Sequence, residues 1–153
     1  MEESLHVVFA AEARAQLNQI DVIHDLVESR VTEEGPAGIE SLGFQLHNLY
    51  CAYEDMLTLV ASVFENNVDK SGGYHIELLR RMNIVVPGVR PRVISGETFR
   101  LLDSLRGFRH VFRHTYGSTL DRRKIDIVVD DARDVRTRFR NDVEDFLSKI
   151  ETR

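Results

Sequence analysis

Residues 121–150 read DRRKIDIVVDDARDVRTRFRNDVEDFLSKI. The opening residues alternate between polar and apolar side chains, a pattern that is also found in β-strands. Beyond them the apolar side chains recur every three or four residues, which is the spacing of one helix face. The apolar positions are Ile125, Val128, Val129, Ala132, Val135, Phe139, Val143, Phe146, Leu147 and Ile150. The longer pattern outweighs the shorter one and predicts a helix that Asp121 caps.

The stretch just before this helix, RGFRHVFRHTYG at residues 106–117, concentrates three arginines, two histidines and a tyrosine. It continues a helical face formed by Phe99, Leu102, Leu105, Phe108 and Phe112. Ser95 is a suitable cap for the start of this helix, and Gly117 is a suitable residue to end it. Crowded polar groups are costly in a protein core unless each has a partner. We therefore expect a ligand outside the fold to use this stretch.

The earlier part of the chain also follows helical spacing. Residues 5–31 and 39–65 form two long apolar stripes, joined by a Gly- and Pro-containing connection at 33–38. A shorter helix is predicted at 74–82, and Pro87 and Pro91 argue for a loop after it. The predicted fold class is all-α, an antiparallel bundle of about four main helices plus a short helix. We expect residues 1–153 to form a single domain.

Composition limits the possible compartments. No apolar run approaches the roughly 20 residues of a membrane span, and the opening Met-Glu-Glu-Ser lacks the basic start of a secretory signal. Cys51 is the single cysteine, so an internal disulfide is excluded and a reducing compartment fits best. We expect a cytoplasmic protein without a membrane partner.

The charge is unevenly distributed. The whole chain carries −5, but residues 100–124 hold seven Arg and Lys against two Asp, a net +5, which leaves −10 for the remainder. A basic patch on an acidic body can bind a polyanion locally. The same arginines can also simply keep a helix face solvated.

Helical geometry constrains how the basic stretch is used. Arg109 and Arg113 lie four residues apart and share a face, as do His110 and His114. Arg109 and His114 lie five residues apart, which places them about 140° apart around a regular helix. For both to face one pocket, either the last turn loosens or a second subunit shares the pocket. We favour a shared pocket at a two-fold homodimer interface.

Arg109, His114 and Tyr116 resemble the Arg, four residues, His, any residue, Tyr signature of HEPN-domain toxins of the HepT type. The segments 46–50 with Glu54, 75–79, 87–95 and 116–121 resemble that group in the same order. One position departs from it, because many relatives have Asn after the arginine and this chain has His110. The resemblance implies an all-α HEPN-like dimer with an RNA-cleaving site at the dimer cleft and no metal or other cofactor.

This implied activity agrees with the residue types. In RNA the 2′-hydroxyl can attack the adjacent phosphorus, so the protein has to move protons and stabilise negative charge. His114 suits acid or base work near neutral pH, and Arg109 offers a charged fork for phosphate oxygens. Arg106, His110 and Arg113 are candidates for binding a tRNA or mRNA strand, and a second copy of His114 is a candidate proton-transfer partner. Glu54 is an accessory candidate, or else an ion-pair partner.

Tyr116 has a second implied role. Toxins of this type are paired with an MNT-type nucleotidyltransferase antitoxin that transfers AMP to the tyrosine of the motif. An anionic adduct two residues from His114 would block the cleft and repel RNA. The alternative is a boundary tyrosine with a buried ring and a wet hydroxyl.

Two other interpretations remain open. His110 and His114 have the spacing of a zinc pair, but Val111 stands where a metalloprotease has glutamate, and no third ligand is near in sequence. The alternative function is a non-catalytic HEPN bundle that binds a nucleotide or serves a nucleotidyltransferase as its substrate-recognition partner. The other four histidines are expected to be satisfied surface or core residues: His6, His24, His47 and His75.

Overall fold

Helices make up nearly all of the described structure. The computed structural model describes residues 2–65, 73–114 and 120–151. In chain order the elements are α1 (Glu2–Val31), α2 (Gly35–Val60), the π-helical segment η1 (Ala61–Glu65), α3 (Tyr74–Met82), α4 (Gly96–Arg113) and α5 (Arg122–Glu151). No strand occurs in these ranges, which confirms the all-α prediction.

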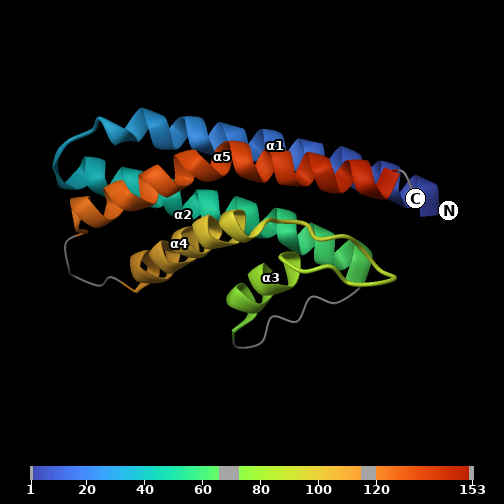
Figure 1. The fold of residues 1–153 in the computed structure, drawn as a ribbon. Coiled ribbons are helices and arrows are strands. Elements are labelled where there is room, and N and C mark those ends of the chain that lie inside the picture. Colours follow the sequence, from blue (N-terminus) through green and yellow to red (C-terminus); the bar gives the residue numbers. More distant parts are fainter. Residues whose placement is uncertain (1, 66–72, 115–119, 152–153) are drawn as a thin grey trace.

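The four long helices form an antiparallel bundle, and α3 is added at one side. Helix α1 packs against α2 and α5, and α4 packs against the same two helices. The helices of each of these four pairs run in opposite directions (Figure 1), and α2 also contacts α5 across the bundle. The short α3 packs on α2 and α4. This arrangement places the basic helix α4 across one face of α2.

Two predicted helix caps are confirmed and one helix start is corrected. The Ser95 hydroxyl accepts a hydrogen bond from Thr98 N at 3.2 Å, and Asp121 Oδ1 accepts one from Arg123 N at 3.0 Å. The connection predicted at 33–38 is shorter, because α2 already begins at Gly35. Proline is well suited to the first turn of a helix, where its missing N–H is not needed, so Pro36 starts this helix rather than preceding it. Gly117 lies outside the described residues.

Aromatic rings fill the bundle centre. Tyr53 of α2 meets Phe139 of α5 edge to face, with centroids 4.6 Å apart. Near the chain ends Phe64 packs against both Phe9 and Phe146, at 5.2 and 5.4 Å. Such edge-to-face pairs contribute beyond the apolar area that they bury. They join α1, α2, η1 and α5 into one core.

A buried polar contact fixes the start of α4. Thr98 is fully buried, and its hydroxyl donates to Asp142 Oδ2 of α5 at 2.6 Å. The same carboxylate oxygen accepts the backbone N–H of Ser95 at 3.0 Å. Further along, Ser104 donates to Asp131 of α5 at 2.5 Å. These bonds tie the first half of α4 to α5.

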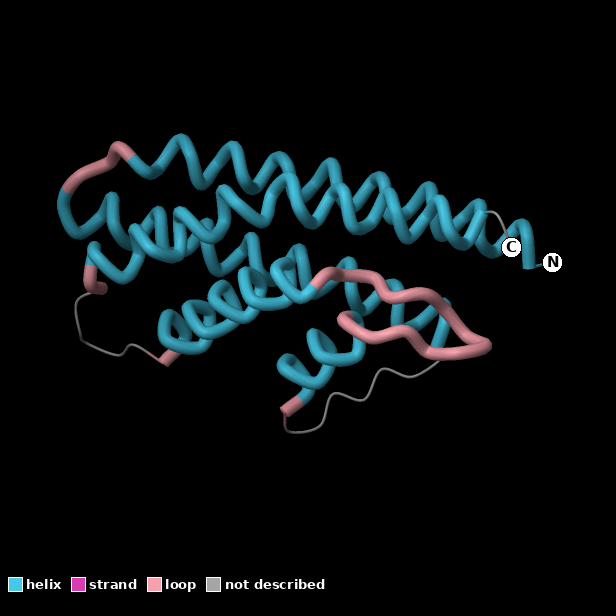
Figure 2. The backbone as a smooth tube through the Cα atoms, in the orientation of Figure 1, coloured by secondary structure: helices cyan, strands magenta, loops and turns pink. Residues whose placement is uncertain are grey.

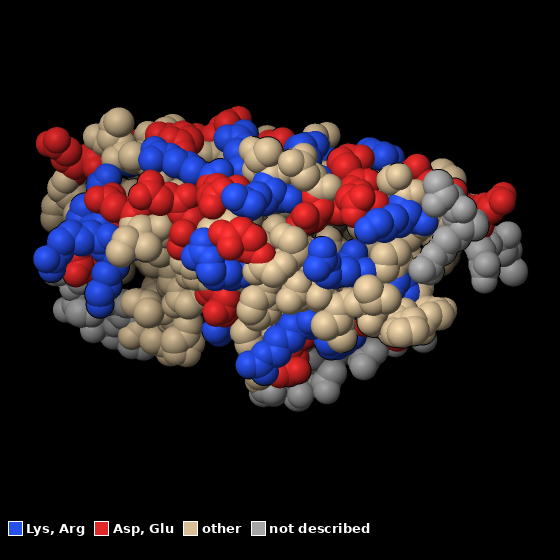
Figure 3. Space-filling view, viewed as in Figure 1, with Lys and Arg blue, Asp and Glu red and all other residues tan. Residues whose placement is uncertain are grey.

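Charged side chains of both signs cover the outer face of the bundle. Figure 3 shows basic and acidic side chains interspersed across the face formed by α1 and α5. Arg133 of α5 binds Glu28 of α1 at 2.7 Å, and Arg136 binds Asp21 and Asp25 at 3.3 and 3.0 Å. Exposed pairs of this kind contribute little individually, about 0 to 1 kcal/mol. Among the described residues, no helix combines the length and apolar character needed to cross a membrane.

The loop between α3 and α4 is ordered, as the two prolines predicted. Figure 2 shows it running outward from α3 and returning to α4. Val86 and Arg90 pair as an isolated antiparallel bridge, with Val86 N 3.0 Å from Arg90 O. Gly88 sits in this turn at φ 78°, a conformation that other residues rarely adopt.

His24 is a satisfied core histidine, as expected, and it makes stability depend on pH. It is 3% exposed and shares a hydrogen bond of 2.6 Å with the Tyr53 hydroxyl. Burial, together with the Arg136 guanidinium, lowers the pKa of His24 from 6.5 to about 4, against the opposing effect of Asp21, Asp25 and Glu28. The unfolded chain therefore binds this proton more readily than the folded chain between these two pH values.

We expect the free energy of unfolding to fall by about 3 kcal/mol, through His24 alone, as the pH drops from 6.5 to 4. Above pH 6.5 this contribution is fully present. Urea unfolding at pH 7 and pH 4.5 measures it, with His24→Gln as the non-titrating control. The wild type should lose more stability than the variant over this interval. Equal losses would show that His24 does not titrate in that window.

Candidate functional site

Helix α4 presents its basic residues at different depths. Leu101, Leu102 and Leu105 are buried against the bundle. Arg109 lies beside this apolar face and is partly buried, whereas Arg113 is exposed. Arg109 Nε is buried without a hydrogen-bond partner in the described residues. A guanidinium with a buried, unpaired Nε–H is prepared to receive an anion.

The end of α4 fixes the orientation of His114. The regular helix ends at Arg113, and His114 N donates to Val111 O at 3.2 Å, a bond across three residues. The Nδ1 atom of His114 lies 2.7 Å from the His110 carbonyl oxygen, which only accepts. Nδ1 therefore carries the hydrogen in the neutral ring, and Nε2 carries the lone pair. The two histidine rings lie together with centroids 4.4 Å apart.

The geometry at the end of α4 argues against a loosened last turn, which is one of the two arrangements that the residue spacing left open. A loosened final turn would have allowed Arg109 and His114 of one chain to face the same pocket. The bond from His114 N to Val111 O spans three residues, which tightens the turn instead. Among the described residues, Arg109 thus lies beside the packed face of α4 while His114 is exposed. The shared pocket between two subunits remains the prediction.

Helix α2 lies opposite Arg109 of α4. Gly43 lets the two helices approach, because an added Cβ there would lie 3.1 Å from Phe112 Cε2 and 3.2 Å from Leu120 Cδ1. One and two turns further along α2, His47 and Tyr50 face α4. We call the surface formed by His47, Tyr50, Arg106, Arg109 and Arg113 the α2–α4 seam. Its two sides come from segments far apart in the sequence.

His47 is the seam residue that sequence reasoning misjudged. We expected a satisfied histidine, but its Nδ1 is buried without a hydrogen-bond partner in the described residues. Its ring packs against Phe112, with centroids 5.6 Å apart, and its Nε2 lies 3.9 Å from Cys51 Sγ, a weak partner. Burial lowers the pKa of His47, and the Arg109 and Arg113 guanidinium groups lower it further. His47 is therefore neutral at pH 7.

Tyr50 and Glu54 continue the seam towards α3. Tyr50 is 1% exposed, and its hydroxyl makes no hydrogen bond of acceptable geometry within the described residues. Burial raises the pKa of this hydroxyl, and the nearby Glu54 carboxylate raises it further. Glu54 itself binds His75 Nδ1 of α3 at 2.6 Å. Glu54 is thus hydrogen-bonded to a histidine of α3.

The basic patch is smaller than the sequence suggested. Four of its seven cations bind nearby carboxylates: Arg100 pairs with Glu97, Arg106 with Asp103, Arg122 with Asp126 and Arg123 with Asp121. Arg109 and Arg113 have no such carboxylate partner among the described residues. These two arginines, which flank His47, are the strongest candidates for binding a phosphate.

The family comparison agrees with this site. A family model described as HepT-like protein matches residues 41–150, well over half of the chain. The chain belongs to the HepT-like family. The matched residues include α3, α4, most of α2 and nearly all of α5, and therefore the whole α2–α4 seam. Searches of curated proteins and of solved structures found no significant match.

The HepT-like motif is only partly visible in the structure. Arg109, His110, Arg113 and His114 are all described, at the C-terminal end of α4. Tyr116, the predicted modification site, lies outside the described residues. Figure 3 shows a notch in the surface between the end of α4 and α3, with basic and acidic atoms inside it. The notch separates the helix that carries the arginines from the helix that carries His75.

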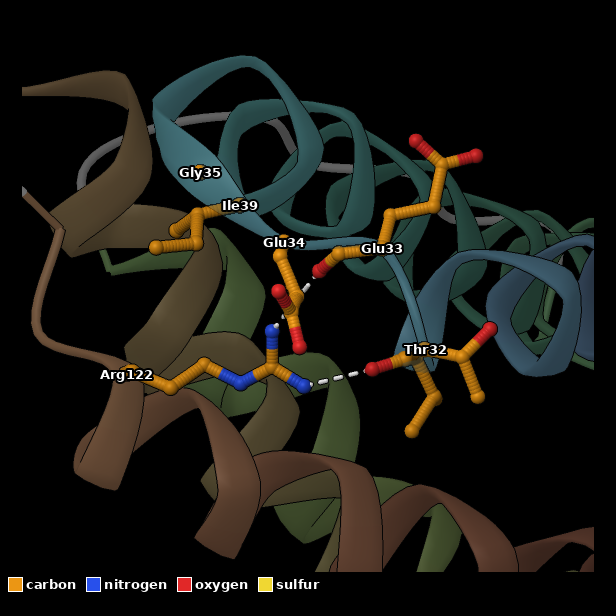
Figure 4. A pocket seen from close by; sticks show the side chains of 7 residues that line it. Thr32, Glu33, Glu34, Gly35, Ile39 and Arg122 are labelled. Carbon is orange, nitrogen blue, oxygen red and sulfur yellow. Dashed lines mark hydrogen bonds between the residues drawn. The ribbon is translucent and has the colours of Figure 1, made fainter.

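The surface of the HepT-like bundle has a second hollow, and the arginine that crosses it has a structural role. Figure 4 shows it between the α1–α2 connection and the start of α5, lined by Thr32, Glu33, Glu34, Ile39 and Arg122 among others. Arg122 points across it and donates to Val31 O at 2.6 Å and Glu33 O at 3.3 Å. This arginine therefore ties the connection to α5, and its donors are already used.

Sequence signals for the two missed seam residues, His47 and Tyr50, did exist. Together with Glu54, the accessory candidate, they follow one another at intervals of three and four residues, the spacing of one helix face. This face is polar, beside an otherwise apolar stripe. The spacing alone did not indicate which helix would cover it, because that depends on how α2 and α4 pack.

Proposed function

We propose that this HepT-like protein is the toxin of a toxin–antitoxin pair and acts as a metal-independent endoribonuclease. Its site is the α2–α4 seam at a homodimer cleft, with Arg109 and His114 as catalytic residues. One observation carries the proposal: Arg109 and Arg113, without carboxylate partners in the described residues, lie on the same helix end as a histidine whose tautomer is fixed. Phosphate binding and proton transfer are the two tasks that RNA cleavage requires.

In this mechanism the protein stabilises charge and moves protons. The 2′-hydroxyl of the ribose gives its proton to the neutral second copy of His114 in the dimer and attacks the adjacent phosphorus, while the Arg109 fork binds the phosphate oxygens. His114, protonated at Nε2, gives its proton to the leaving 5′-oxygen. Arg113, with His110 and Arg106 as accessory groups, binds neighbouring phosphates of a tRNA or mRNA. The reaction leaves a 2′,3′-cyclic phosphate and a 5′-hydroxyl.

Neutralisation by an MNT-type nucleotidyltransferase completes the proposal. Transfer of AMP to Tyr116 would place a bulky anion two residues from His114. The anion would compete with RNA phosphates for Arg109 and Arg113. This part is supported by the family membership and by the position of Tyr116 in the sequence.

We expect unmodified wild-type protein to cleave mixed tRNA and mRNA in excess EDTA, and His114→Ala to lower the rate by at least about 100-fold. Protein is expressed without an antitoxin, and its mass is checked for an adduct on Tyr116. His6→Ala, which changes a histidine of α1 stacked on Phe64, is the matched control and should cleave like the wild type. Unmodified, dimeric wild type that leaves RNA intact would contradict the proposal and favour a non-catalytic binding bundle.

A further inference from the structure

Partnerless buried polar atoms gather at the α2–α4 seam. Within the described residues five buried side-chain atoms lack a hydrogen-bond partner, and His47 Nδ1 and Arg109 Nε of the seam are two of them. A third, the Tyr50 hydroxyl, has the Glu54 carboxylate nearby as a candidate acceptor. Leaving a buried polar atom unpaired is costly, because nothing replaces the water that it lost. The unpaired atoms of His47 and Arg109 in one seam therefore indicate that their partners arrive with a ligand.

His47 has the properties of a proton acceptor that becomes stronger when a phosphate binds. The charged and titratable groups that face it in the described residues are Arg109 and Arg113 of α4 and Cys51 of its own helix. The two arginines oppose protonation of the imidazole. A bound phosphate neutralises them, and thereby removes part of what lowers the pKa of His47. Its ring is held against Phe112, so it is also fixed in place.

We propose that His47 is a further catalytic residue of the seam, the base that accepts the proton of the attacking 2′-hydroxyl. The inference rests on the ribonuclease function proposed above and deepens it. His47 acts from the same subunit as Arg109, because both belong to one seam. His114 is exposed at the C-terminal cap of α4 whereas Arg109 is partly buried beside the packed face, so the acid in each site is His114 of the partner subunit.

The step balances without any further reactant. The 2′-O–H bond breaks and its proton passes to an imidazole nitrogen of neutral His47. The freed electron pair forms the new bond from the 2′-oxygen to phosphorus, and the bond from phosphorus to the 5′-oxygen breaks. The leaving oxygen takes a proton from the protonated His114 of the partner subunit. His47 therefore replaces the second copy of His114 as the opposite proton-transfer partner.

The first test is the pH dependence of cleavage. A neutral base and a protonated acid give a bell-shaped profile, whose acidic limb reports the base. His47→Gln should lower the rate near pH 7 by at least about 100-fold and abolish that limb. Its affinity for uncleavable 2′-O-methyl RNA should change by less than about threefold, because the variant loses no charge. His6→Gln, in α1, is the control and should keep the wild-type rate and profile.

The second test asks which residues share a site. Mixed dimers of His47→Gln with His114→Ala should regain about half the wild-type rate, since one of the two composite sites is complete. Mixed dimers of His47→Gln with Arg109→Ala should not regain activity, because each site lacks either His47 or Arg109. The reverse pattern would assign His47 to the other subunit's site and overturn the proposal.

The outcomes separate the two proposals. If the wild type cleaves and His47→Gln keeps both its rate and its acidic limb, the role of His47 falls and the ribonuclease function stands. If the unmodified wild type does not cleave, both fall. Circular dichroism verifies that the variant folds, and His47→Asn replaces it if it does not. Normal cleavage by a folded His47→Asn would equally overturn the inference.

Discussion

Replacing Arg109 with lysine is expected to slow RNA cleavage by about 100-fold or more, although the charge is kept. Lysine is a point charge and cannot offer two parallel donors to the phosphate oxygens. It is also more strongly hydrated than a guanidinium, so the partly buried position beside Tyr50 and Phe112 suits it poorly. The loss should appear in kcat, because the fork is used most when charge builds on the phosphate.

Single-turnover cleavage by Arg109→Lys measures this effect. Arg123→Lys is the matched control, because the Arg123 side chain is 91% exposed and pairs with Asp121 near the start of α5. Binding of 2′-O-methyl RNA should change by less than about tenfold in either variant. If Arg109→Lys cleaves within threefold of the wild type, the bidentate role of Arg109 is wrong.

Replacing Arg90 with methionine is expected to destabilise the fold by about 3 to 5 kcal/mol. Arg90 belongs to the loop between α3 and α4, and its side chain is completely buried. Its guanidinium donates to the carbonyl oxygens of Arg81, Ile84 and Pro91 at 2.9 to 3.0 Å and to Glu65 at 3.1 Å. Methionine fills the space but leaves these acceptors without donors, a larger loss than the loss of the bonds themselves.

Urea unfolding at pH 7 measures the change in the free energy of unfolding. Arg92→Met is the control, since Arg92 lies in the same loop and is exposed. Arg90→Lys should lose less than Arg90→Met, because lysine can still reach one acceptor. A loss below about 1 kcal/mol in Arg90→Met would mean that water enters and satisfies the carbonyls.

Much of the fold followed from local spacing. The helix of residues 121–150 was predicted from apolar residues at three- and four-residue intervals, and α5 covers nearly the same range. The caps Ser95 and Asp121 were also predicted, because a cap acts on the next two or three residues. The start of α2 was wrong because Pro36 was interpreted as a break.

Less of the candidate site than of the fold followed from the sequence. The spacing of Arg109, Arg113, His110 and His114 determines which of them share a face, and the structure agrees for the two histidines. The count over residues 100–124 overestimated the basic patch, because Glu97 and Asp126 lie just outside that range and pair with Arg100 and Arg122. His47 was missed because its significance comes from α4, which the sequence alone does not place next to it.

The sequence thus determined the all-α class, the order of the helices and the divergence of Arg109 from His114, since all three depend on residues within a few positions of one another. Only the tertiary structure decided that His47 and Tyr50 face Arg109, and that Arg90 is buried. These contacts depend on how closely whole helices and loops pack. Gly43 of α2 permits the close approach of Phe112 of α4, and this approach brings the two helices of the seam together.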